Sequence, residues 1–110
     1  MKRGDIVTVT AAGDYGKPRP AVVVQSDYLT GAGLGSLIVC LISGHLEEAP
    51  AFRLSVEPTP GNGLRKPSQI MIDKVATVRR SRIGKRIGRL DDESTLRLNR
   101  SLAFVMGLAD

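Results

Sequence analysis

The chain is organised around residues 16–25, which read GKPRPAVVVQ. Proline fixes its own φ angle and pushes the preceding residue towards extended geometry, so Lys17 and Arg19 are both expected to be extended. Residues 21–24 are apolar and mostly β-branched, which is typical of a buried central strand. Arg19 is therefore expected to be a cation held at the end of a rigid strand, where it is well placed to bind a phosphate.

Length and composition predict a single globular domain that covers residues 1–110. A chain of 110 residues is long enough for one hydrophobic core and too short for two. Its 42% apolar and 25% charged residues are ordinary for a soluble globular protein. No apolar run approaches the roughly 18 residues of a membrane span, and residues 1–5 lead into a strand without the apolar core of a signal peptide. A cytoplasmic protein with no membrane contact is the default expectation.

The charge balance and the rare residue types narrow the chemistry. A formal net charge of +5 and a pI of about 9.9 favour a polyanion or an acidic protein as partner. The one cysteine, Cys40, lies inside an apolar run, so we expect it to be buried and unreactive. With one cysteine and one histidine, His45, the usual zinc-ligand spacings are ruled out, and no metal or cofactor is expected.

The pattern of apolar residues predicts about six short strands. In residues 51–57 the apolar side chains of Phe52, Leu54 and Val56 alternate with polar ones, which is typical of a half-buried strand. Residues 27–36 hold three glycines and are expected to form a mobile surface loop. The expected strands cover residues 6–10, 19–26, 37–43, 51–57, 69–72 and 74–78, the last two being either separate or one bent strand.

A C-terminal helix follows the strands. Residues 91–93, DDE, supply an N-cap and negative charge at the positive end of a helix, and Gly107 is expected to end it. Leu98, Leu102, Val105 and Met106 recur at helical spacing. The whole pattern predicts a mainly β fold, a small, strongly curved antiparallel barrel with an amphipathic helix packed on it.

Five motifs occur in order along the chain. They are RGDIV at 3–7, RPAVVVQ at 19–25, IVCLIS at 38–43, PSQIMID at 67–73 and IGKRIGRL at 83–90. In this order and at these intervals the chain resembles the MazF/PemK family of toxin endoribonucleases, from Lys2 to the final helix. The resemblance implies an SH3-like barrel that works as a homodimer. It also implies a metal-independent, sequence-selective enzyme that cuts single-stranded mRNA, leaves a 2′,3′-cyclic phosphate and a 5′-hydroxyl, and is inhibited by an acidic antitoxin.

RNA cleavage without a metal needs deprotonation of the 2′-OH, stabilisation of the phosphorane charge and protonation of the 5′-oxygen. The resemblance puts the catalytic arginine at Arg19. A guanidinium stays charged and binds two phosphate oxygens, so we assign charge stabilisation to it, with proton donation as an option. Ser43 stands where the family usually has Thr, and its hydroxyl is expected to bind the scissile phosphate. Asp14 matches the family more loosely, as a base for the 2′-OH or as a group that orients Arg19.

Each of these residues also has a plain structural interpretation. Arg19 can be a solvated strand-end arginine, Ser43 can cap a turn, and Asp14 can be an exposed loop residue. Asp73 begins a DKVATV run that resembles a family run, but Ala76 stands where the family has arginine. Asp73 is therefore either an accessory site residue or structural.

Four cations are expected near the proposed cleft, on loops or on a solvent face. Tyr15 is a candidate to stack a base, and His45 either assists or is an ordinary loop histidine. Because the chain has only two Tyr and two Phe, phosphate contacts are expected to dominate RNA binding. The four cations are Lys17, Arg53, Arg65 and Lys66.

The densest basic run, residues 79–89, has three open interpretations: a nucleic-acid site, a docking site for an acidic antitoxin segment, or a solvated face. Gly84 and Gly88 within it are expected to allow close packing. The resemblance places this run away from the catalytic loops, so it is not counted in the active site.

Two other functions remain open at this level. One is a non-enzymatic DNA gyrase inhibitor like the related CcdB toxins, which use C-terminal residues that include Trp; this chain has no Trp. The other is an RNA-binding barrel that has lost activity, which the Ser43 departure and the loose match of Asp14 keep open.

Overall fold

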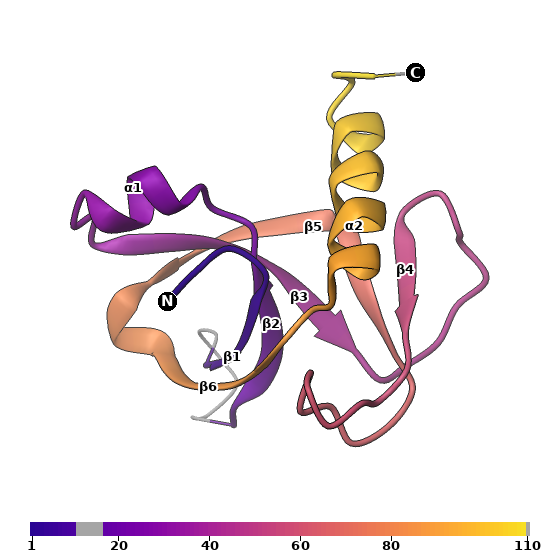
Figure 1. The fold of residues 1–110 in the computed structure, drawn as a ribbon, viewed down its shortest axis with the longest axis horizontal. Coiled ribbons are helices and arrows are strands. Elements are labelled where there is room, and N and C mark those ends of the chain that lie inside the picture. The colour runs from indigo at the N-terminus through magenta and orange to yellow at the C-terminus, as the bar shows by residue number, and fades with distance from the viewer. Residues whose placement is uncertain (11–16, 110) are drawn as a thin grey trace.

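The structure is a computed structural model that describes residues 1–10 and 17–109 (Figure 1). A 3₁₀ turn, Arg80–Arg82, joins the last two strands. The elements within the described residues are β1 (Asp5–Val9), β2 (Arg19–Val23), α1 (Asp27–Gly31), β3 (Ser36–Ser43), β4 (Arg53–Val56), β5 (Ser68–Arg79), β6 (Ile83–Arg89) and α2 (Asp92–Val105).

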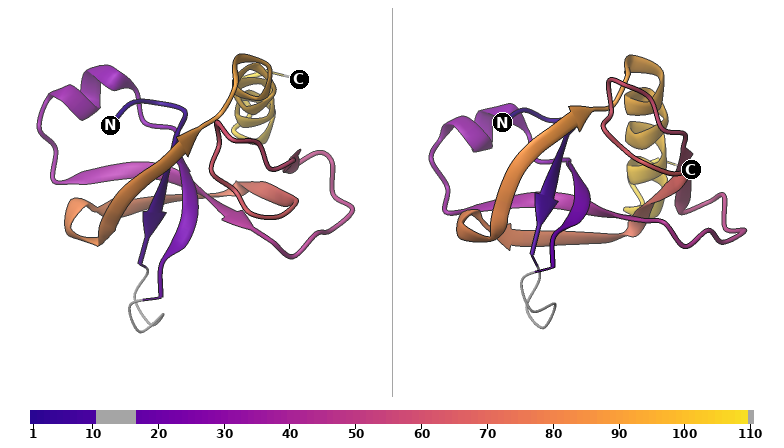
Figure 2. Two further views of the ribbon diagram at one scale, coloured as in Figure 1. Left: turned by 60° about the horizontal axis from the view of Figure 1, so that its bottom comes forward. Right: turned by 90° about the horizontal axis from the view of Figure 1, so that it is seen from below.

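These strands form one antiparallel sheet in the order β4-β5-β3-β2-β1-β6. The sheet is strongly curved, and its β1–β2–β6 part lies at a steep angle to β3 and β5 (Figure 2). Helix α2 packs against β5 and β4. The expected mainly β, barrel-like fold with a C-terminal helix is confirmed, although β4 and β6 are edges and the sheet does not close.

The central strands are buried on both faces, as their apolar sequences predict. Val22 and Cys40 belong to the core cluster that includes Leu98 and Leu102 of α2, whereas the neighbouring Val23 lies in a second cluster on the other face. Burial raises the pKa of the Cys40 thiol to about 11, so the thiol stays protonated at neutral pH. The buried structural interpretation of Cys40 is confirmed.

The expected loop over residues 27–36 is wrong in its first half, because α1 forms there. Ser26 caps this helix by accepting a hydrogen bond from the Leu29 N–H at 3.3 Å. Arg80 then reaches across from the 3₁₀ turn and donates to the carbonyl oxygens of Leu34 at 3.3 Å and Thr30 at 3.2 Å. The Ser26 cap is a local start signal for this short helix, and the two long-range bonds from Arg80 hold the glycine-containing segment that follows it.

One of the two alternatives for residues 69–78 is confirmed, because they lie in a single strand, β5, whose pairing with β3 is irregular between Cys40 and Ile42. Residues 83–89 form β6, which the sequence pattern did not predict as a strand. The expected close packing of the glycines in β6 is confirmed, since a Cβ at Gly84 would overlap Thr8 and one at Gly88 would overlap the Asn62 backbone.

Helix α2 begins and ends as predicted. The Asp91 side chain accepts a hydrogen bond from the Ser94 N–H at 2.7 Å, and Gly107 ends the helix with a φ of +74°. Leu98 and Leu102 are buried. Val105 and Met106, expected on the same apolar face, are exposed. Among the residues that the structure describes, no helix is both long enough and apolar enough to cross a membrane.

Candidate active site

A groove of about 790 Å³ lies where the ends of several strands meet. Apolar side chains, among them Leu41, Leu64 and Met71, line it together with polar ones. None of its described lining residues is acidic. The groove is therefore suited to an anion that also carries apolar surface, as a nucleotide chain does. Five cations line it: Lys17, Arg19, Arg65, Lys66 and Lys85.

Strand pairing brings Arg19 and Ser43 to the same end of the sheet. Ala21 of β2 lies opposite Leu41 of the antiparallel strand β3. Arg19 is two residues before Ala21 and Ser43 is two residues after Leu41, so both continue the register towards the same end. Both residues line the groove, and Arg19 is exposed.

The Ser43 hydroxyl also shapes the turn that follows β3. Its Oγ accepts a hydrogen bond from the His45 N–H at 3.0 Å. The next part of the loop is fixed by Gln69, which is paired with Ser43 across the sheet: Gln69 donates to the Glu47 carbonyl oxygen at 2.8 Å and accepts from the Glu47 N–H at 2.9 Å. The capping interpretation and the groove-lining interpretation of Ser43 are thus compatible.

A buried asparagine organises the turn that carries Arg65 and Lys66 into the groove. Asn62 Oδ1 accepts from the N–H groups of Thr59 and Leu64, both at 3.0 Å, and Nδ2 donates to the Glu57 carbonyl oxygen at 2.8 Å. Gly63 has a φ of +70° and lies directly against Ile87 of β6, where a Cβ would overlap the carbonyl oxygen. The role of Asn62 was not predicted from the sequence, although an Asn-Gly pair is a recognised turn signal.

Lys85 belongs to the basic run that was not expected in the active site, yet it lines the groove. Lys85 lies on β6 and lines the groove with Ile87, two residues further along the same face of that strand. Recognition of β6 as a strand would have placed them together. Other members of the basic run have structural partners: Arg80 binds the α1 segment, whereas Arg86 Nε and Arg89 Nη1 each lie 3.1 Å from Asp5 Oδ1.

Arg53 was expected on a loop or a solvent face, but the structure places its side chain in a buried position. Only 9% of its side chain is exposed, and its Nη2 lies 3.4 Å from Glu47 Oε2. Its Nε and Nη1 have no hydrogen-bond partner within the described part of the chain. Arg53 does not line the groove, so direct contact with a ligand bound there is not indicated.

Four other candidate residues fall outside the groove or outside the described residues. His45 is on the adjoining turn, with 82% of its side chain exposed and Nε2 3.8 Å from Glu47 Oε1. Asp73 is exposed on β5 and pairs with Lys74 at 3.3 Å, which favours its structural interpretation. Asp14 and Tyr15 lie outside the described residues.

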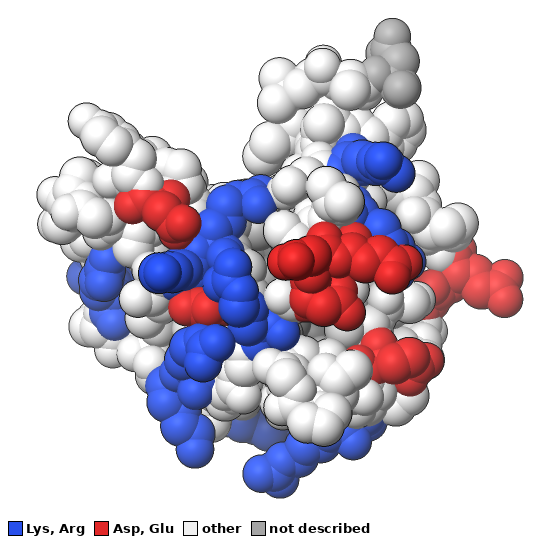
Figure 3. All heavy atoms as spheres, in the orientation of Figure 1, with Lys and Arg blue, Asp and Glu red and all other residues white. Residues whose placement is uncertain are grey.

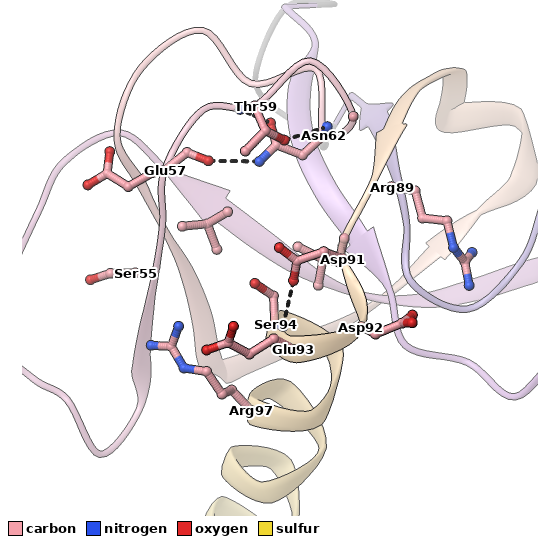
Figure 4. A pocket seen from close by; sticks show the side chains of 13 residues that line it. Ser55, Glu57, Thr59, Asn62, Arg89, Asp91, Asp92, Glu93, Ser94 and Arg97 are labelled. Atoms are coloured by element: carbon pink, nitrogen blue, oxygen red, sulfur yellow. Dashed lines mark hydrogen bonds between the residues drawn. The ribbon is translucent and has the colours of Figure 1, made fainter.

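A second hollow, of about 610 Å³, has the opposite charge character (Figure 4). It lies between the start of α2 and the turn after β4, and its acidic residues Glu57, Asp91, Asp92 and Glu93 outnumber Arg89 and Arg97. On one face of the molecule, Figure 3 shows a band of Lys and Arg beside a distinct group of Asp and Glu. Carboxylates repel phosphates, so this hollow does not suit a nucleic acid.

Comparison with known proteins places the chain in a family. A family model described as PemK-like, MazF-like toxin of type II toxin–antitoxin system matches residues 2–106. The chain belongs to this toxin family. The resemblance read from the five sequence motifs is thereby confirmed.

Relatives of this toxin include a protein named probable endoribonuclease MazF from Mycolicibacterium smegmatis, 42% identical over 110 residues and aligned over 99% of both chains. The fold of the chain described here is similar to that of the Mycobacterium tuberculosis toxin MazF-mt6, with a TM-score of 0.80 and 19% identity. The match covers 96% of this chain and 99% of MazF-mt6. A mycobacterial endoribonuclease in complex with its cognate antitoxin gives a TM-score of 0.79 at 15% identity, with 100% and 98% covered.

Proposed function

We propose that this toxin is a sequence-selective endoribonuclease that cuts single-stranded mRNA without a metal ion, in the cytoplasm and as a single domain over residues 1–110. The observation that carries the proposal is the basic groove in which Arg19 and Ser43 continue paired strands towards the same end. The relative named probable endoribonuclease MazF, at 42% identity, supports the same activity.

In the proposed reaction the 2′-hydroxyl loses its proton to a base and attacks the adjacent phosphorus. The bond to the 5′-oxygen breaks, that oxygen gains a proton, and the products are a 2′,3′-cyclic phosphate and a 5′-hydroxyl. Arg19 stabilises the charge that builds on the phosphate oxygens, since a guanidinium stays protonated and is a poor base. Ser43 hydrogen-bonds the phosphate, and Asp14 is the candidate base.

The partners proposed for this toxin follow from its charge and its exposed apolar residues. A net charge of +5 suits an acidic antitoxin, and the structure of the related mycobacterial endoribonuclease contains its cognate antitoxin. Exposed apolar side chains cluster at the end of α2, where Phe104, Met106 and Leu108 are 54%, 55% and 79% exposed. Such a surface is suited to being covered by a second copy, as in the expected homodimer.

The test is incubation of purified protein with a long unstructured RNA in EDTA, with the new ends mapped at nucleotide resolution. We expect discrete cuts with 5′-hydroxyl ends. Arg19→Ala should abolish them, and Ser43→Ala should slow them by about 10²-fold, as for loss of one donor to a transition-state oxygen. Arg100→Ala, which changes an exposed arginine of α2 outside the groove, is the matched control.

Failure of the folded wild-type protein to cut any RNA would contradict the proposal. Two further assays then separate the alternatives. Inhibition of DNA supercoiling by gyrase would indicate a gyrase inhibitor, and RNA binding without cleavage would indicate an inactive barrel. Cleavage that survives Arg19→Ala would leave the activity in place and refute the site.

A further inference from the structure

The side chain of Lys66 lies across Gly44, the residue that follows Ser43. A Cβ built on Gly44 would overlap Lys66 Cε, and it would lie 2.7 Å from Nζ and 3.4 Å from Cδ. The ammonium group therefore occupies the space that any larger residue at position 44 would fill. Both residues line the groove that contains Ser43 and Arg19.

Lys66 is also fixed at its backbone. Its carbonyl oxygen accepts a hydrogen bond from Ser68 Oγ at 2.9 Å, and Pro67 follows it directly. A lysine side chain has many rotamers in solution and loses entropy when it is held in one. Here the backbone of Lys66 is fixed by the Ser68 hydrogen bond, and its ammonium group lies in the space that Gly44 leaves open.

No carboxylate of the described residues lines the groove around this ammonium group. The charged groups that line the groove around it, within the described residues, are all cations: Lys17, Arg19, Arg65 and Lys85. Adjacent cations repel one another. Such an arrangement is stabilised by an anion in the groove, and the Ser43 turn is where this site would hold one.

We propose that Gly44 is a positioning residue whose missing side chain seats the Lys66 ammonium beside Ser43, so that Lys66 and Arg19 together bind the scissile phosphate. This inference rests on the proposed ribonuclease function and adds a second cation to its transition state. A cation that only grips the RNA backbone affects binding, whereas one that meets the charge built in the transition state affects the rate of the bound complex.

Gly44→Ala tests the proposal because it keeps every charge in the groove. Gly44 is not among the glycines with positive φ, and the atoms that a methyl group would displace are the far end of a flexible side chain. The fold should therefore tolerate the change. Gly35→Ala is the matched control, since a Cβ there has nothing within 4 Å.

The readouts are the single-turnover cleavage rate, the Kd for the same RNA with a 2′-deoxy sugar at the mapped cut site, and the urea unfolding midpoint. We expect Gly44→Ala to cut at least about 10-fold more slowly, as misplaced catalytic groups do, with Kd changed less than about 3-fold and an unchanged midpoint. Lys66→Met should slow cleavage by about 10²-fold. In the Lys66→Met background, Gly44→Ala should cause no further loss.

Three results would overturn the inference while leaving the ribonuclease intact. The first is cleavage by Gly44→Ala at the rate of Gly35→Ala, and the second is an equal loss from Gly44→Ala in the wild-type and Lys66→Met backgrounds. The third is a loss confined to Kd, since Lys66 would then only bind the RNA backbone. A wild-type protein that cuts no RNA would overturn both this inference and the function on which it rests.

Discussion

At the scale of single residues, the groove depends on charges that are held in place by neighbours of different kinds. Lys66 is seated by an absent side chain at Gly44, and Ser43 is oriented by the turn that it caps. Asp5 is held by opposite charge, since Arg86 and Arg89 both lie 3.1 Å from its Oδ1 and the Lys2 N–H donates to Oδ2 at 2.8 Å. This acid joins β1 to β6, the strand that carries Lys85.

The Asp5 cluster predicts a specific pH dependence of stability. Burial alone raises the pKa of Asp5, but the Lys2 N–H and the two guanidinium groups outweigh it and lower the pKa below its ordinary value. The contribution of Asp5 to the free energy of unfolding is therefore complete above the pKa of an aspartate in the unfolded chain, about 3.9. It is lost as the pH falls below that value towards the lower pKa of the folded state. Asp5→Asn should cost about 1–2 kcal/mol at pH 7, because the arginines are half exposed.

Urea unfolding of the wild type and of Asp5→Asn between pH 7 and pH 3 measures this difference. The gap in unfolding free energy should narrow below pH 4. A gap that stays constant down to pH 3 would show that the Asp5 charge is not what stabilises the folded state.

Residue-scale expectations succeeded where a local feature fixes position and failed where tertiary contacts decide. The prolines around Arg19 and the end of an apolar strand at Ser43 are visible in the sequence, and both residues line the groove as expected. Arg53 has the right alternation for a solvent face, but its side chain is buried beside Glu47. Alternation separates the two faces of a strand and does not reveal which other segments cover each face.

At the scale of elements, the turn between β4 and β5 is the part that completes the groove. The Asn62 side chain makes three hydrogen bonds to the backbone of residues 57–64, and Gly63 and Gly88 let this turn lie directly on β6. The contacts of Gly63 with Ile87 and of Gly88 with Asn62 therefore fix the positions of Arg65 and Lys66 relative to β6. Loss of the turn should release both cations from the groove.

Asn62→Ala should lower the free energy of unfolding by about 2–3 kcal/mol, since three partly buried backbone groups lose their partner. It should also slow RNA cleavage by the folded protein, because Lys66 is no longer held near Ser43. Asn99→Ala on the exposed side of α2 is the control. An unfolding free energy within about 0.5 kcal/mol of wild type would contradict the role given to Asn62.

The elements that were missed, α1 and β6, share a cause. In residues 83–89 the glycines at 84 and 88 pack closely by lacking a side chain, so the segment shows no apolar alternation. In residues 27–36 the three glycines favour a loop, and the helix is held by Arg80 from a distant segment. The long strands and α2 were predictable because the apolar pattern and the capping residues of each element lie within its own stretch of sequence.

At the scale of the whole molecule, the charges are separated into a basic groove and an acidic hollow at the start of α2. The net charge of +5 by itself says only that an anionic partner is favoured. The separation of charges also indicates where such a partner binds, because an RNA strand is attracted to the groove and repelled from the hollow.

RNA binding should therefore depend steeply on salt. Each cation that engages a phosphate of a single strand contributes about 0.7 to the slope of log Kd against log salt, so five cations give a slope of at most about 3.5. Lys85→Met should lower the slope by about 0.7, whereas Arg100→Met, outside the groove, should leave it unchanged. Titration of the 2′-deoxy RNA between 50 and 300 mM salt measures it. An unchanged slope in Lys85→Met would remove Lys85 from the RNA site.

The most direct single measurement is cleavage, in EDTA, of an RNA with one 2′-deoxy sugar at a mapped cut site, beside the all-ribose RNA. If the groove works by attack of the 2′-hydroxyl, the cut at that bond disappears while the RNA still binds with similar Kd and is cut at its other sites. Cleavage at the deoxy position would contradict this chemistry and would require a different nucleophile in the groove.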